Sequence, residues 1–232
     1  MVEIKGLEPF ASKDFPGHIA ATVFLGGCNF RCPYCHNSQL VLDPQSLPTY
    51  PIDYLLGFLD VRKDWLEGIC ITGGEPVLHP DLDVFLAVLK ERHLLVKLDT
   101  NGTFSDRLEK YLELKLVDFV AMDIKAPLKR YAEVVRVEVD LEAIGRSVKL
   151  IRDSGVSAMF RTTVVPGLVG RKDLMEIGRW LEGADLFQIQ QFSPKNTLDP
   201  AFEKRESFGR EDLETMAEDL RPFFKEVRLE GI

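Results

Sequence analysis

The chain of 232 residues has 29 Lys and Arg against 37 Asp and Glu, which gives a net charge of −8, and 45% of its residues are hydrophobic. This length fits one large domain, and the composition excludes an intrinsically disordered protein. The acidic balance disfavours a protein that holds nucleic acid mainly through phosphate contacts or one that lies on an anionic membrane.

The N-terminal residues predict no targeting signal, because no basic segment is followed by an apolar one. No apolar run reaches the ~18 residues that a membrane span requires. We therefore expect a cytoplasmic protein. Three of the four cysteines, Cys28, Cys32 and Cys35, fall within eight positions. A disulfide framework would spread its cysteines, so this cluster favours a reduced compartment and metal or redox chemistry.

Six short apolar segments rich in β-branched or aromatic residues are predicted as buried strands. They are residues 19–25, 69–72, 94–98, 117–122, 156–165 and 186–190. Helical spacing of apolar residues predicts five helices, around 52–59, 82–89, 141–151, 174–181 and 213–220. Asp140 is the expected N-cap of the third helix and Gly155 its stop, and residues 37–51 are expected to form a long loop.

Strands that alternate with helices predict right-handed crossovers and a parallel sheet. Periodicity alone leaves an open partial barrel and a doubly wound sheet as alternatives. Polar or glycine-rich motifs follow all six strands, at 26–28, 73–76, 99–102, 123–125, 166–167 and 191–194. Ligands of parallel α/β proteins bind at the carboxyl edge of the sheet, so we expect these motifs to share one rim.

The three clustered thiols, with spacings of three and two residues, allow one loop to wrap three corners of a compact metal cluster. Three ligands are one too few for a closed zinc site or a simple ferredoxin-type cluster. An iron–sulfur cluster with one open iron is the favoured interpretation. A Cys3His zinc site with His36 or His18, or a plain electron-transfer module, remains the alternative of another class.

The motif Cys28-x3-Cys32-x2-Cys35, with Tyr34 before its last cysteine, resembles the cluster motif of the radical S-adenosylmethionine superfamily. In that superfamily three thiolates hold a 4Fe-4S cluster, and the fourth iron is chelated by S-adenosylmethionine. The resemblance implies an α/β fold, a partial (βα)6 TIM-like barrel. It also implies a single domain over residues 1–232, with a core at about 12–195 and a C-terminal helix and strand within 205–232.

Five further segments resemble the activating enzymes of glycyl radical enzymes, most closely the activating proteins of anaerobic ribonucleoside-triphosphate reductase. They are residues 14–17 (Asp-Phe-Pro-Gly), 35–37 (Cys-His-Asn), 72–76 (Thr-Gly-Gly-Glu-Pro), 97–102 (Lys-Leu-Asp-Thr-Asn-Gly) and 121–127 (Ala-Met-Asp-Ile-Lys-Ala-Pro). Larger activating enzymes with an inserted ferredoxin domain are excluded, because only Cys70 remains outside the cluster motif. Cys70 is expected to be a core residue.

The resemblance assigns roles to residues of the rim. Gly73, Gly74 and Glu75 are expected at the methionine end of S-adenosylmethionine, and Tyr34 is expected beside its adenine. The remaining expected cofactor contacts are Thr100, Asn101, Asp123 and Lys125. A monovalent cation is expected near Asp99, Thr100 and Asp123. We also expect Asp123 and Lys125 to point to opposite sides of a straight strand.

Arg161, on the fifth predicted strand, is a candidate site residue, because a guanidinium inside a barrel needs an anion such as a substrate or cofactor carboxylate. Related activating enzymes often place a histidine after the sixth strand. Residues 191–195 contain none, so the group that takes its place is left open.

The resemblance implies reductive cleavage of S-adenosylmethionine to a 5′-deoxyadenosyl radical, which takes a hydrogen atom from a glycine Cα of a partner glycyl radical enzyme. The expected partner is anaerobic ribonucleotide reductase, and the expected electron donor is a flavodoxin or ferredoxin. A small-molecule substrate, as in the 7-carboxy-7-deazaguanine synthases, remains an alternative. No nucleic acid or membrane partner is expected.

Overall fold

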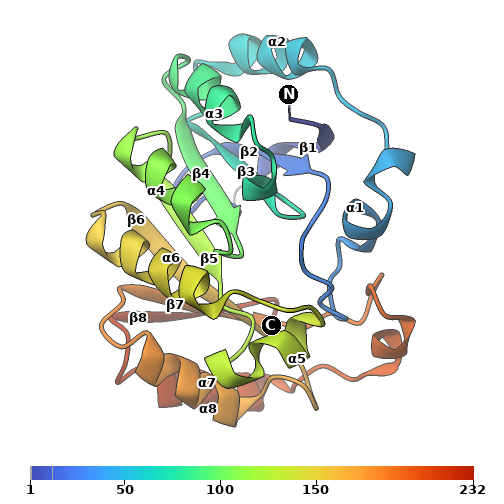
Figure 1. Cartoon of the computed structure of the whole chain (residues 1–232), viewed down its shortest axis with the longest axis vertical. Helices are drawn as coiled ribbons and strands as arrows, with labels where there is room; N and C mark the ends of the chain where they lie inside the picture. Colours follow the sequence, from blue (N-terminus) through green and yellow to red (C-terminus); the bar gives the residue numbers. More distant parts are fainter. Residues whose placement is uncertain (1, 12) are drawn as a thin grey trace.

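The computed structural model describes residues 2–11 and 13–232, and it contains one sheet of eight strands that lie in chain order (Figure 1). The strands are β1 (Ile4–Ala11), β2 (Ala20–Leu25), β3 (Gly68–Gly73), β4 (Leu95–Thr100), β5 (Phe119–Asp123), β6 (Ser157–Val164), β7 (Leu186–Gln191) and β8 (Glu226–Glu230). Met1 and Ser12, where the predicted domain and its predicted core begin, lie outside the described residues.

Eight α-helices are found among the described residues. They are α1 (Ser38–Leu42), α2 (Ile52–Arg62), α3 (Leu82–Lys90), α4 (Ser105–Glu113), α5 (Tyr131–Val135), α6 (Leu141–Asp153), α7 (Arg171–Trp180) and α8 (Arg210–Leu220). None of these helices is long and apolar enough to cross a membrane. Helices α3, α4, α6, α7 and α8 follow one another around the outside of the sheet, whereas α1 lies apart at the opposite edge (Figure 1).

The sheet is an open barrel. Strand β1 pairs with β2 in the antiparallel direction, and β2 to β8 pair in parallel with their neighbours in sequence. The described residues form no ladder between β1 and β8, so the ring does not close. The partial TIM-like barrel is therefore confirmed, and the doubly wound alternative is wrong, because that fold changes the direction of its strand order.

All six predicted strands are present as β2 to β7, and the C-terminal helix and strand are present as α8 and β8. The predicted cap is also present, because the Asp140 carboxylate accepts hydrogen bonds from the amides of Glu142 (3.0 Å) and Ala143 (3.1 Å). Gly155 follows α6 with a φ of 72°, in the left-handed region that ends helices. The division into one domain with a core at 12–195 stays a proposal.

Four elements were not predicted from the sequence: β1, α1, α4 and the five-residue helix α5. Strand β1 contains Gly6 and Pro9, which are tolerated because it is an edge strand. Helix α4 buries only Ser105, Leu108 and Tyr111, too few for a clear apolar stripe. The predicted loop 37–51 contains the short helix α1.

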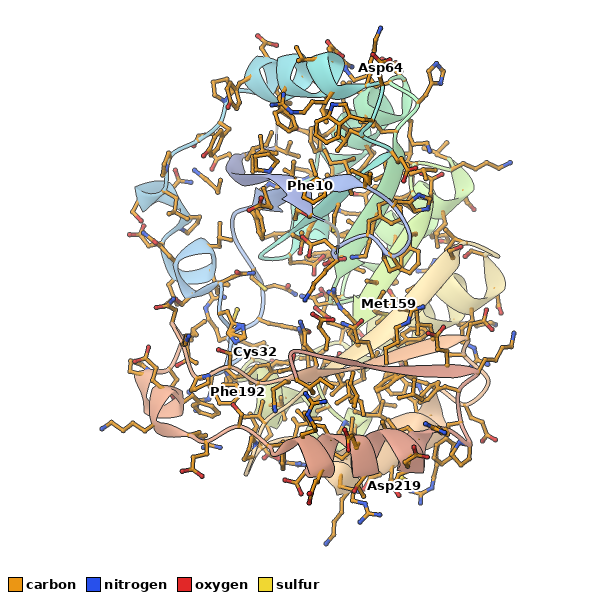
Figure 2. The ribbon with its side chains drawn as sticks, turned by 180° about the vertical axis from the view of Figure 1, so that it is seen from behind. Phe10, Cys32, Asp64, Met159, Phe192 and Asp219 are labelled. Carbon is orange, nitrogen blue, oxygen red and sulfur yellow. The ribbon has the colours of Figure 1, made fainter. Side chains whose placement is uncertain are left out.

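The inner face of the barrel changes from apolar to polar along the strands. Near the amino ends of the strands lies a small apolar cluster that includes Phe15, Phe119 and Met159, the last of which is labelled in Figure 2. Nearer the carboxyl ends of the strands the inward positions become polar, as in Thr72, Asp99 and Asp123. Because the apolar cluster fills the barrel at the amino ends of the strands, the cavity lies at their carboxyl ends.

Candidate functional site

A cavity of about 310 Å³ lies at the carboxyl ends of strands β2 to β7. Every residue predicted for the site lines it, although the residues come from five different loops and strands. They are Cys28, Cys32, Tyr34, Cys35, Gly73, Gly74, Glu75, Asp99, Thr100, Asn101, Asp123, Lys125 and Arg161. The expected common rim is therefore present, while the role of each residue stays a prediction.

The cluster loop, which we define as residues 28–35, follows β2 and leads towards α1. Cys32 is buried, whereas Cys28 and Cys35 are partly exposed, and no cysteine forms a disulfide. Burial raises the pKa of the Cys28 thiol to about 12 and that of Cys32 to about 11. The thiols are therefore protonated near neutral pH until a metal binds, and binding must release their protons.

The described residues contain no group of three His, Cys, Asp or Glu side chains that could hold a single metal ion. The Nε2 atom of His36 instead lies 3.0 Å from the carbonyl oxygen of Ser193. The Cys3His zinc alternative therefore finds no support in this structure. Three thiols that face one cavity without meeting at one point suit the separate corners of a cluster.

Asparagine side chains join the cluster loop to the neighbouring rim loops. The Asn29 amide donates to Thr103 Oγ1 (2.9 Å) and accepts from the Asn101 amide (2.9 Å). Just beyond the loop, Asn37 donates to the carbonyl oxygen of Gly73 (2.7 Å). Asn101, a predicted cofactor contact, is thus already engaged in holding the cluster loop.

Gly73 and Gly74 are required by close contacts between backbones. A Cβ atom at Gly74 would lie 1.9 Å from the Gly27 carbonyl oxygen, and one at Gly73 would lie 2.3 Å from that of Leu25. Gly73 also has a φ of 118°, which side chains disfavour. Both glycines are expected at the methionine end of S-adenosylmethionine, but packing of this loop on β2 and the cluster loop already demands them.

Glu75 is 1% exposed and accepts three hydrogen bonds from the protein. The donors are the hydroxyl of Thr100 (2.8 Å) and the backbone amides of Asn101 (2.7 Å) and Val77 (3.0 Å). Burial outweighs these bonds and raises the pKa of Glu75 to about 7. Its first role is to join the loops after β3 and β4, while the predicted contact with an ammonium group remains a prediction.

Five charged side chains, which we call the charged ladder, alternate in sign across the inner face. They are Lys97, Asp99, Arg161, Asp123 and Lys125. Arg161 donates to Asp99 (3.1 Å) and to Asp123 (2.8 Å), and Lys125 donates to the other oxygen of Asp123 (3.1 Å). Lys97 pairs with Asp99. The anion predicted for Arg161 is thus present, but it is supplied by the protein.

The expectation that Asp123 and Lys125 point to opposite sides was wrong, because side chains two residues apart in extended backbone share a face, and Lys125, just beyond the end of β5, meets Asp123. Their ion pair is the result. Although burial opposes ionisation, the charges of Arg161 and Lys125 hold the pKa of Asp123 well below its usual range. Both members of the predicted Asp-x-Lys contact are therefore charged.

The Asp99 carboxylate has protein donors on both oxygens. Lys97 and the thiol of Cys70 (3.8 Å) reach one oxygen, while Thr72 (3.1 Å) and Arg161 reach the other. Cys70 is fully buried, as predicted. Because protein cations already neutralise both Asp99 and Asp123, the geometry gives no separate reason for a monovalent cation, which stays a prediction.

Tyr34 provides a test of whether the cavity fits a nucleoside. Its ring is buried, and its hydroxyl has no hydrogen-bond partner among the described residues. A buried hydroxyl without a partner is costly. Since Tyr34 lines the cavity, a bound ligand with polar edges, such as an adenine, would remove this cost.

Nine residues that line the cavity were not predicted as contacts: Asp14, Phe24, Phe30, His36, Asn37, Val41, Thr72, Thr163 and Gln190. Thr163 and Gln190 are neighbours in the ladder between β6 and β7. Their inward direction follows from the alternation of Arg161 and Thr163 along β6, a signal that the sequence contains. Asp14 accepts from Thr22 (2.5 Å), a contact that no local pattern indicates.

Comparisons with known proteins agree with this geometry. Residues 22–181 match the family model of the radical SAM superfamily. A Methanocaldococcus jannaschii protein, provisionally named a glycyl-radical enzyme activating enzyme, is 32% identical over 99% of this chain and 96% of its own length. The pyruvate formate-lyase-activating enzyme of Streptococcus mutans is 28% identical over 84% of this chain and 78% of its own.

Among solved structures, Streptococcus suis SuiB bound to S-adenosylmethionine has a TM-score of 0.69 at 17% identity. The match covers 88% of this chain but only 48% of SuiB, so this chain spans about half of that protein, and the likeness concerns the fold. The family model and the full-length relative carry the assignment: the chain belongs to the radical SAM superfamily.

Proposed function

We propose that this chain activates a glycyl radical enzyme by removing a hydrogen atom from a glycine Cα, and that its partner is anaerobic ribonucleotide reductase. The observation that carries the proposal is the common cavity, where three thiols meet the loops after β3, β4 and β5. The M. jannaschii relative supports the activating role because its similarity extends over nearly the whole of both chains.

Members of the superfamily use a 4Fe-4S cluster and S-adenosylmethionine. The donor set fits them, because three thiols leave one cluster corner for a ligand, and Tyr34, whose hydroxyl has no partner among the described residues, lines the same cavity. Cys28, Cys32 and Cys35 would hold the cluster. When bound and reduced, the cluster supplies the electron that cleaves S-adenosylmethionine to methionine and a 5′-deoxyadenosyl radical.

The chain itself would orient the cofactor and limit access of water. Lys125 keeps its charge, since the Asp123 carboxylate outweighs the effect of burial and raises its pKa. It can therefore serve as a fixed cationic donor to a carboxylate of the cofactor. Phe24, Phe30 and Val41 add apolar wall to the cavity, which helps to keep water from a reactive carbon radical.

Glycine suits this chemistry as a substrate. Its Cα has no side chain to block approach, and the neighbouring amide groups delocalise the unpaired electron. The sheet is open between β1 and β8, which supports entry of a loop from another protein into the barrel. The four free cysteines are consistent with a cytosolic location and with a flavodoxin or ferredoxin as the electron donor.

The choice of ribonucleotide reductase rests on the resemblance carried by the Cys-His-Asn and Asp-x-Lys segments. The S. mutans relative makes pyruvate formate-lyase the natural comparison partner. The test is to mix the reduced, cluster-loaded chain and S-adenosylmethionine with either partner and record electron paramagnetic resonance spectra. A glycyl doublet on the reductase alone supports the proposal, and a doublet on the lyase alone replaces the partner.

No doublet with either partner, together with cleavage of S-adenosylmethionine, would shift the assignment to a small-molecule substrate. A partner variant with alanine at the target glycine is the control, because it removes the hydrogen atom that forms the doublet while leaving the fold of the partner loop nearly unchanged.

A further inference from the structure

The cluster loop is enclosed by two segments that lie far from it in the sequence. On one side, the amide of Arg31 donates to the carbonyl oxygen of Val135 (2.9 Å), the last residue of α5. On the other side lies a segment that follows β7, which we call the strap and define as residues 193–199. Figure 2 labels Cys32 of the cluster loop and Phe192, the residue before the strap.

The strap contacts the cluster loop and its next residue at three points. The amide of Leu198 donates to the carbonyl oxygen of Cys35 (3.0 Å), and the amide of Asp199 donates to that of Pro33 (2.9 Å). The third contact joins His36 Nε2 to the Ser193 carbonyl oxygen (3.0 Å). The strap therefore fixes the backbone on both sides of Tyr34, including that of a cysteine expected to hold iron.

One ion pair joins the two enclosing segments. Arg136, next to Val135, donates from its guanidinium to the Asp199 carboxylate (2.7 Å). Arg136 ends α5 with a φ of 58°, a conformation that long side chains rarely adopt. The other Asp199 oxygen accepts from the Ala201 amide (3.0 Å), and the Thr197 hydroxyl donates to the Asp199 carbonyl oxygen (2.8 Å). The carboxylate is thus held in place to meet Arg136.

We propose that Arg136 and Asp199 are positioning residues whose ion pair closes a belt around the cluster loop and slows the loss of the iron–sulfur cluster. The belt consists of Val135, Arg136 and Asp199, and its bonds to the Arg31 amide and the Pro33 carbonyl oxygen join it to the loop in one closed circuit. Neither side chain lines the cavity, so the pair acts through the loop backbone and does not touch the cofactors. The proposal rests on the cluster that the proposed function requires.

The pair is partly exposed, with 47% and 25% of its side-chain surfaces accessible, so its contribution to global stability is small. Its local effect is larger, because the strap lacks a strand or α-helix of its own and is held by these few bonds. Loss of the pair should increase the opening of the strap about three- to fivefold, the factor that a well-formed surface ion pair supplies.

The test uses the full chain loaded with its cluster under anaerobic conditions and measures the rate of iron release to an excess of chelator. Arg136→Gln and Asp199→Asn should each release iron about three- to fivefold faster than the wild type. The double variant should be no faster than either single variant, because both remove the same interaction. Arg136→Lys, which keeps the charge, should stay near the wild-type rate.

Arg171→Gln is the matched control. It breaks the exposed Arg171–Asp219 pair between α7 and α8, and Figure 2 shows Asp219 far from Cys32. Hydrogen exchange gives a second readout, in which Arg136→Gln should expose the amides of residues 28–37 while leaving those of α7 and α8 unchanged. Thermal unfolding of each variant separates a local effect from general loss of the fold.

Wild-type iron release from both Arg136→Gln and Asp199→Asn would overturn the proposal, as would equal acceleration by Arg171→Gln or additive effects in the double variant. None of these measurements involves a glycyl partner. Results that overturn the belt proposal therefore do not affect the proposed function. Likewise, failure to activate any partner does not affect the belt proposal.

Discussion

The cluster loop and the charged ladder line the same cavity, but different parts of the chain hold them in place. Within the charged ladder, the carboxylates of Asp99 and Asp123 pair with cationic side chains at neighbouring inward positions. The cluster loop is instead held by hydrogen bonds from other parts of the chain, namely the loop after β4, the end of α5 and the strap after β7. The metal-binding motif is thus contiguous in sequence, while its support is dispersed.

The largest effect should come from removing a thiol. Cys32→Ser should reduce iron retention and S-adenosylmethionine cleavage by more than the roughly 10- to 100-fold that changes around a metal site cause, because it removes a ligand itself. Cys70→Ser is the matched control, since the Cys70 thiol contacts Lys97 and Asp99 and Cys70 does not line the cavity. Iron analysis of anaerobic protein checks both variants, and an equal loss in Cys70→Ser would contradict the assignment.

Removal of Arg161, the central cation of the charged ladder, should lower the free energy of unfolding. Arg161→Gln leaves two buried carboxylates short of a donor, so we expect a loss of about 3 kcal/mol in the free energy of unfolding. Adding Asp123→Asn should recover part of this loss, because one uncompensated charge is then gone. Denaturant unfolding of the apoprotein measures the stability of both variants. An Arg161→Gln variant as stable as the wild type would show that Arg161 does not stabilise the two carboxylates.

Glu75 should make the stability of the apoprotein depend on pH. Its pKa is about 7 in the folded protein and near 4.5 when unfolded, so its stabilising protonated form is fully present below about 4.5. That contribution is lost as the pH rises through 7, by up to about 3 kcal/mol. Unfolding measured from pH 5 to 8 should show this decline, and Glu75→Gln should remove it. A parallel decline in the variant would assign it to other groups.

The smallest effect is expected at Tyr34. Because its hydroxyl has no protein partner, Tyr34→Phe should leave the apoprotein unchanged or stabilise it by about 1 kcal/mol. The same change should weaken S-adenosylmethionine binding to the loaded protein. Calorimetry of unfolding and of binding tests the two expectations, and a destabilised apoprotein with unaltered binding would indicate a packing role instead.

Much of the fold was predictable because strands β2 to β7 are short segments rich in apolar and β-branched residues and five helices have clear apolar stripes. The antiparallel β1 was not, since its glycine and proline hide an edge strand. The site residues were predictable where they sit in short motifs, as in Cys28 to Cys35 and Gly73 to Glu75. That these motifs line one cavity followed from the rule that carboxyl ends of parallel strands share an edge.

The contacts between motifs were not predictable. Arg161 meets Asp99 and Asp123 only because β4, β5 and β6 are neighbours in a particular register. The strap after β7 was judged to offer no histidine contact. Which group takes its place stays open, whereas the contact of His36 with the Ser193 carbonyl oxygen joins two loops that no sequence pattern relates. Such contacts depend on how loops pack, which periodicity does not encode.

The central claim is that three thiols and the rim loops form one site for a cluster and S-adenosylmethionine. The most direct measurement is the electron paramagnetic resonance spectrum of the reduced, anaerobically loaded chain before and after S-adenosylmethionine is added. We expect a 4Fe-4S signal that changes on addition. A colourless zinc protein, or a cluster signal that S-adenosylmethionine leaves unaltered, would contradict the account.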